Sequence, residues 1–151
     1  MAQPTLISFS YDGREDYDVP KVMLRALIYA TGKRGHLIEN MFLNLHHQGR
    51  KHGFAVWGFA EGKLDRGGGL FVPDTGVVAY HHFNPIDEFD FRFTPGEYQI
   101  EVFGAVVGRK ASLKLFSGTV RMDHVKALEP STVYYFNWDP ADRRYNGEFQ
   151  F

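Results

Sequence analysis

The chain contains no cysteine among its 151 residues. This absence excludes disulfides, thiolate metal sites and a cysteine nucleophile, so packing must hold the fold together. Long hydrophobic runs are also missing. No stretch approaches the roughly 18 apolar residues of a membrane span, and the first residues, MAQPTLISFSYDG, lack the basic start and apolar run of a signal peptide. We therefore expect a cytoplasmic protein with no membrane partner.

The chain has almost no excess of charge of either sign. Its 17 Lys and Arg residues against 18 Asp and Glu residues give a formal net charge of −1, which creates no field that would attract a polyanion. The basic pairs Arg50-Lys51, Arg109-Lys110 and Arg143-Arg144 are dispersed, and each lies beside an expected turn. Nucleic acid is therefore not expected as a partner.

Aromatic residues are what the chain has in excess. They make up 16% of it, with fourteen Phe, eight Tyr and two Trp, and such side chains suit pleated sheets better than helix bundles. Segments that alternate between apolar and polar residues recur between turns, at spacings typical of sandwiches. The length fits one domain over residues 1–151. We predict an all-β fold, an antiparallel β-sandwich of about eight or nine strands with one short helix.

The clearest alternation runs through residues 88–103, EFDFRFTPGEYQIEVF. Phe89, Phe91 and Phe93 fall on one face of the first half, and alternation resumes after Pro95-Gly96. This pattern predicts a β-hairpin with one apolar and one polar face.

Similar patterns predict strands elsewhere in the chain. The expected strands are Thr5–Tyr11, Leu37–His47, Phe54–Phe59, Leu70–Val72, Val77–Phe83, Ala111–Phe116, Val133–Trp138 and Tyr145–Phe151, with the last two forming a hairpin. Gly67-Gly68-Gly69 is expected to form a bend between strands. The short helix is expected over Asp123–Leu128, with Asp123 as its N-cap and Pro130 ending it.

The segment Asp18–Gly32 fits either a helix or a strand. Asp18 as N-cap, Pro20 in the first turn and Gly32 at the end favour a helix. Alternation favours a strand, because apolar residues recur at every second position: Val22, Leu24, Ala26 and Ile28. We favour the strand, since an aromatic β domain offers it pairing partners and tertiary context overrides propensity.

Two adjacent histidine pairs, His46-His47 and His81-His82, lie near the ends of expected strands. Adjacent residues of a strand point to opposite faces, so one imidazole from each pair can face a shared site. With Glu88, two imidazoles and a carboxylate match an iron facial triad or a zinc site with an open position. The alternative is that these histidines form local hydrogen bonds at strand ends.

The residues around the second pair follow the order of a known motif. Gly76, His81, His82, Glu88 and Gly96 run in the order of the first motif of the cupins, and over about twenty residues the chain resembles that family. The resemblance implies a metal-dependent enzyme with histidine and glutamate ligands. The chain departs from the cupin pattern in that its two histidines are adjacent and no second motif follows.

An aromatic platform for a ligand is another candidate site. Trp57, Tyr80, Asn137 and Trp138 are the candidate ligand-binding residues, with Asn137 and Trp138 at a hairpin entrance. The alternative is that these aromatic residues are core or pair across strands. No Gly-x-Ser-x-Gly elbow occurs, so no catalytic residue is assigned.

Three functions follow from these observations. The leading hypothesis is a non-catalytic binding or assembly module, which associates with a protein partner or with itself through sheet edges. The first alternative is a cupin-like metal-dependent enzyme, and a divalent metal is the one cofactor considered. The second alternative is binding of a carbohydrate or a small apolar ligand.

Overall fold

The structure is a computed structural model that describes residues 1–60, 64–66, 69–124 and 126–150. Its regular elements are strands: β1 (Leu6–Gly13), β2 (Asp18–Ile28), β3 (His36–His47), β4 (Arg50–Phe54), β5 (Val56–Ala60), β6 (Leu64–Arg66), β7 (Leu70–Val72), β8 (Val77–Asn84), β9 (Gly96–Val106), β10 (Leu113–Met122), β11 (Val133–Asp139) and β12 (Arg144–Gln150). The described residues include no helix long and apolar enough to cross a membrane.

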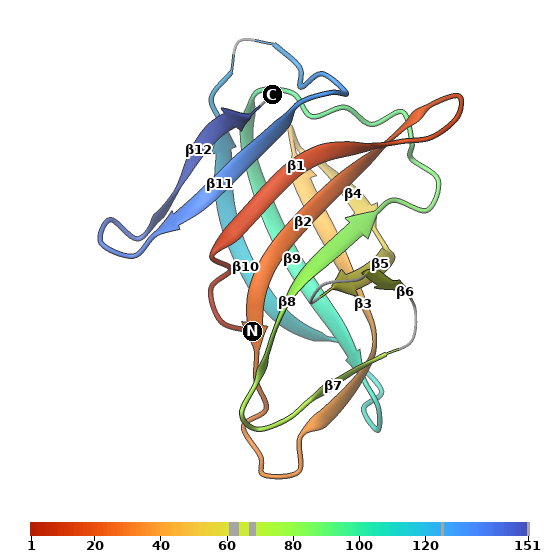
Figure 1. The fold of residues 1–151 in the computed structure, drawn as a ribbon, viewed down its shortest axis with the longest axis vertical. Helices are drawn as coiled ribbons and strands as arrows, with labels where there is room; N and C mark the ends of the chain where they lie inside the picture. Colours follow the sequence, from red (N-terminus) through yellow and green to blue (C-terminus); the bar gives the residue numbers. More distant parts are fainter. Residues whose placement is uncertain (61–63, 67–68, 125, 151) are drawn as a thin grey trace.

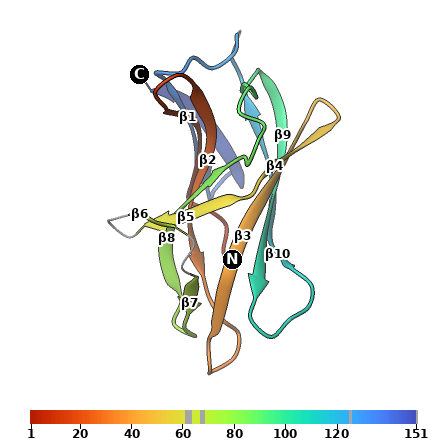
Figure 2. The ribbon, with the colours of Figure 1, turned by 90° about the vertical axis from the view of Figure 1, so that its right-hand side faces the viewer.

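The strands form two antiparallel sheets that face each other. One sheet has seven strands in the order β12-β11-β1-β2-β8-β5-β6 (Figure 1). The other has five strands: four follow the order β10-β9-β3-β4, and β7 pairs with the opposite end of β3 from β4. Viewed from the side, the sheets form two layers (Figure 2). The predicted all-β sandwich is confirmed, with more strands than predicted.

Aromatic side chains fill the space between the layers. Phe9 of β1 stacks on Phe93, with ring centroids 4.5 Å apart, and contacts Tyr98 of β9 and Phe136 of β11 edge-on at 4.8 and 4.9 Å. These four side chains are fully or almost fully buried. Such edge-to-face and offset pairs add to the stabilisation that burial provides. The aromatic excess is thus explained in part by the core.

The segment that fitted either a helix or a strand is a strand. Its first eleven residues, Asp18–Ile28, form β2, which pairs with β1 on one side and β8 on the other. Val22 and Leu24 are fully buried, whereas Lys21 and Arg25 lie on the opposite face. Two pairing partners and a buried face outweigh the capping signals of a helix.

The predicted C-terminal hairpin is confirmed, and the predicted central hairpin is wrong in its first half. Strands β11 and β12 pair in register over the described residues, and Phe151 lies outside them. Residues 88–95 form no strand. The backbone N–H of Phe93 donates to the Tyr11 hydroxyl, and that of Thr94 donates to the Tyr98 hydroxyl. These side-chain acceptors replace a neighbouring strand, while Phe91 and Phe93 remain buried as the alternation predicted.

The helix predicted over Asp123–Leu128 is also wrong. None of its described residues is helical, and Val125 lies outside the described part. Leu128 is buried and its N–H donates to the carbonyl of Phe93, so it packs against the core in an extended connection. The Asp123 carboxylate accepts a hydrogen bond from Nε of Arg121 rather than capping a helix. The predicted bend at Gly67-Gly68-Gly69 falls largely outside the described residues, which include only Gly69 of the three.

Candidate functional site

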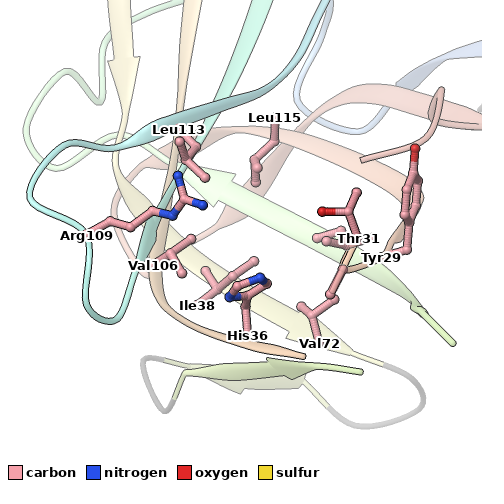
Figure 3. Close-up of a pocket in the computed structure, with 11 residues that line it drawn as sticks. Tyr29, Thr31, His36, Ile38, Val72, Val106, Arg109, Leu113 and Leu115 are labelled. Atoms are coloured by element: carbon pink, nitrogen blue, oxygen red, sulfur yellow. The ribbon is translucent and has the colours of Figure 1, made fainter. Parts of the chain in front are cut away.

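An apolar cleft of about 150 Å³ opens between the two sheets at one end of the sandwich. The seven-stranded sheet contributes the end of β2, and the five-stranded sheet contributes β3, β7, β9 and β10. The apolar lining consists of Ile28, Ala30, Ile38, Val72, Val106, Leu113 and Leu115, and the polar lining of Tyr29, Thr31, His36 and Arg109 (Figure 3). The cleft thus lies where both inner faces meet solvent.

The alternation of the strands explains why aliphatic side chains face this cleft. Ile28 and Ile38 are at inward positions of β2 and β3 and are 3% and 2% exposed. Val106 ends β9 and is also buried, whereas Leu113 and Leu115 at the start of β10 are half-buried. The inner faces therefore continue to the open end of the sandwich with mostly aliphatic side chains.

The size and lining of the cleft suit a small apolar molecule. An enclosed cavity of about 150 Å³ with an apolar lining accepts benzene, and this cleft has the same volume but is open to solvent. Displacing poorly ordered water from such a lining by an apolar group is favourable. Figure 3 shows Tyr29 and Thr31 on one side of the cleft and Arg109 on the other.

A second, polar depression lies at the opposite end of β3, where His47, His52, Glu88 and Thr94 line it together with other residues. Nδ1 of His52 lies 2.8 Å from Oε1 of Glu88. His47 has Nδ1 2.9 Å from the carbonyl oxygen of Glu97 and Nε2 2.8 Å from Oγ1 of Thr94. These bonds occupy both ring nitrogens of His47 and connect the end of β3 to the start of β9 and to the segment before it.

The structure separates the candidate metal ligands. His46 and His47 belong to the five-stranded sheet, whereas His81 and His82 belong to the seven-stranded sheet. Glu88, the proposed carboxylate, pairs instead with a histidine in β4. Among the described residues, no three His, Cys, Asp or Glu side chains gather closely enough to hold a metal ion.

Each histidine on the proposed metal site has a local environment instead. Nε2 of His46 lies 2.5 Å from Oε1 of Glu101, and Lys114 and His46 together lower the pKa of that carboxyl. His81 is fully buried beside Trp57, and burial lowers its pKa to about 4. His52, the partner of Glu88, was not among the candidate site residues, because residues 50–53 were not expected to form a strand. It lies two residues before the buried Phe54 in β4, so strand alternation places it inward.

The aromatic platform candidates lie on two different faces of the seven-stranded sheet. Cross-strand pairing places Asn137 opposite Leu6, Leu6 opposite Arg25, and Arg25 opposite Tyr80, so Asn137 and Tyr80 share the outer face. Trp57 is buried on the inner face, opposite Phe83.

Trp138 shares the inward face with Phe136, two residues before it, and is partly exposed. Its ring packs against Tyr145, with centroids 5.0 Å apart. The structure therefore does not bring the four candidate residues together.

The fold and its cleft define a class, an antiparallel β-sandwich with an apolar cleft at one open end. Comparison of the chain with protein-family models, with curated proteins and with solved structures finds no match in any of the three. The function must therefore be inferred from the site itself.

Proposed function

We propose that this protein is a non-catalytic binding module that takes a small apolar molecule into the cleft between its sheets. One observation carries the proposal: aliphatic side chains of both sheets converge on an open cleft of about 150 Å³. The proposal combines two hypotheses from the sequence: that the protein is a binding module, and that it binds a small apolar ligand. The metal-dependent enzyme loses support, because no three His, Cys, Asp or Glu side chains gather closely enough among the described residues to hold a metal ion.

The expected affinity follows from the apolar surface that a ligand would bury. Burial contributes about 0.8 kcal/mol per CH₂ group, so a six-carbon chain gains about 5 kcal/mol before the cost of immobilisation. Because immobilisation reduces this gain, dissociation constants of about 1 mM or weaker follow for a simple probe. A natural ligand would need further polar contacts at the rim to bind more tightly.

Ligand-observed NMR with 1-hexanol tests this proposal. Saturation transfer from the protein to 1-hexanol is expected for the wild type. Ala30 lines the cleft and is almost buried, so Ala30→Leu should fill part of the volume and weaken binding at least fivefold. Ala111→Leu makes the same change at an exposed position outside the cleft and should bind as the wild type does.

Two results would contradict the proposal. One is the absence of saturation transfer with the folded wild type. The other is equal binding by Ala30→Leu and the wild type, because a ligand in the cleft must compete with the added side chain. Circular dichroism of both variants confirms that each is folded.

Self-association is a second candidate function. Leu37 and Phe71 are paired across β3 and β7 and are 45% and 57% exposed, and Val107, whose N–H donates to the carbonyl of Leu37, is 53% exposed. Three exposed apolar side chains, two on paired strands and one in the turn after β9, favour contact with a second copy. Sedimentation velocity should show a mass that rises with concentration and a weaker rise for Phe71→Ser; a strict monomer would exclude this candidate.

A further inference from the structure

The rim of the cleft carries a positively charged side chain, that of Arg109. Arg109 and His36 belong to the lining, and none of the described lining residues is Asp or Glu. Within the described part of the chain, the Arg109 guanidinium makes no hydrogen bond and no ion pair. An unpaired arginine is ordinary on an open surface. At the mouth of an apolar cleft, it is a donor group placed where one end of a bound molecule would lie.

The backbone of the β9–β10 connection directs Arg109 to this position. Gly108 has φ +90°, a conformation that favours glycine, and the N–H of Arg109 donates to the carbonyl of Val106 at 3.1 Å. This turn brings the chain back toward the cleft immediately after β9 ends. Figure 3 shows the Arg109 side chain reaching from the loop toward Leu113, with His36 lower in the view.

We infer that the ligand of the cleft is a small amphipathic carboxylic acid, whose apolar part enters the cleft and whose carboxylate binds Arg109. The inference rests on the proposed function and specifies its ligand. A volume of about 150 Å³ limits the apolar part to one ring or a chain of about six carbons. His36 supplies a second N–H donor at the same rim.

Charge and geometry favour a carboxylate over other polar groups. The guanidinium presents parallel N–H donors that match the two oxygens of a carboxylate, and charge-assisted bonds are stronger than neutral ones. A cationic ligand would lie beside Arg109 without any acidic side chain in the lining to offset the repulsion. One permanently charged side chain matches a monoanion better than a phosphate dianion.

A set of six-carbon probes tests the inference. Hexanoate, 1-hexanol, hexylamine and hexyl phosphate share the chain and differ in the head group. We expect hexanoate to bind the wild type about three- to fivefold more tightly than 1-hexanol, because Arg109 is exposed and solvent screens its contact with the carboxylate. Hexylamine should bind least. Added salt should reduce the advantage of hexanoate and leave 1-hexanol nearly unchanged.

Arg109→Gln should remove most of the hexanoate advantage and leave 1-hexanol binding intact. Lys110→Gln removes the adjacent positive charge, which lies outside the lining, and should change neither affinity by more than about twofold. Both positions are exposed, so neither substitution should unfold the protein.

The outcomes separate this inference from the proposed function. If 1-hexanol binds as tightly as hexanoate, or if Arg109→Gln leaves their ratio unchanged, the cleft is a binding site but the carboxylate inference is wrong. If hexyl phosphate binds more tightly than hexanoate, the head group is a phosphate and the inference is also wrong. If no probe binds, the proposed function itself is wrong and the inference falls with it.

Discussion

Trp57 donates its indole N–H to Nδ1 of His81 at 3.2 Å, on the buried face of the seven-stranded sheet. The two rings are nearly parallel, with an interplanar angle of 13°. Because Nδ1 accepts this bond, the neutral imidazole carries its proton on Nε2, which is buried without a hydrogen-bond partner among the described residues. The core therefore contains a neutral histidine, and protonation of the His81 ring opposes folding.

We predict that acid destabilises the protein through His81. Burial and, to a smaller extent, His82 lower the pKa of His81 from 6.5 to about 4. Between these values the unfolded chain binds the proton and the folded chain does not, so the free energy of unfolding falls as the pH falls. The stability that depends on a neutral His81 is fully present above pH 6.5 and is lost by about pH 4. The free energy of unfolding changes by about 3 kcal/mol over this range.

Urea unfolding followed by tryptophan fluorescence at several pH values between 7 and 4 measures this slope. His81→Gln keeps an acceptor for Trp57 but has no titrating ring, so its stability should vary less over the same window. An equal slope for the variant and the wild type would show that other groups cause the acid sensitivity.

We predict that His47 stabilises the end of β3 far more than its neighbour His46 does. His47 is buried, bonds through both ring nitrogens and stacks on Tyr98 with centroids 3.8 Å apart. His47→Ala should cost about 2–4 kcal/mol, since the fully buried Tyr98 loses its stacking partner and two part-buried hydrogen bonds are lost. The His46 side chain is about one-third exposed in a surface ion pair, and His46→Ala should cost less than about 1 kcal/mol. Urea unfolding compares the two variants, and a reversed order would contradict this assignment.

We predict that Gly147 is required by the packing of Tyr134 beneath it. A Cβ at this position would lie 2.5 Å from Cε1 and 2.6 Å from the hydroxyl oxygen of Tyr134, which is 4% exposed. Gly147→Ala should therefore destabilise the protein by about 1–3 kcal/mol. At Gly53 the nearest atom lies 3.9 Å away, so Gly53→Ala should be neutral or slightly stabilising. Thermal unfolding of both variants tests this, and equal melting temperatures would contradict the packing argument.

The strands were predictable where alternation coincides with pairing. Strand β9 alternates strictly, as does the C-terminal hairpin, and both form as predicted. The two errors share a cause. The residues around Phe93 have the pattern of a strand and those around Leu128 the signals of a helix, yet the N–H of Leu128 donates to the carbonyl of Phe93. This hydrogen bond and the tyrosine hydroxyls that accept from Phe93 and Thr94 take the place of regular pairing, and no local pattern reveals the partners that lie far away in the sequence.

The cleft was not predictable for a different reason. Its lining comes from five strands and the adjoining loops, and each apolar residue reads as an ordinary core position in its own segment. From the sequence, Arg109 was interpreted as one member of a solvated basic pair beside a turn. The turn is present in the structure. Its position at the mouth of an apolar cleft depends on how the two sheets pack.

The most direct test of the central claim is an NMR titration of isoleucine methyl groups with hexanoate. Ile28 and Ile38 line the cleft, whereas Ile7, Ile86 and Ile100 do not. The account predicts saturable shifts at Ile28 and Ile38, with little change at the other three. Absence of shifts at Ile28 and Ile38, or larger shifts at Ile7 and Ile100 in the central core, would contradict it.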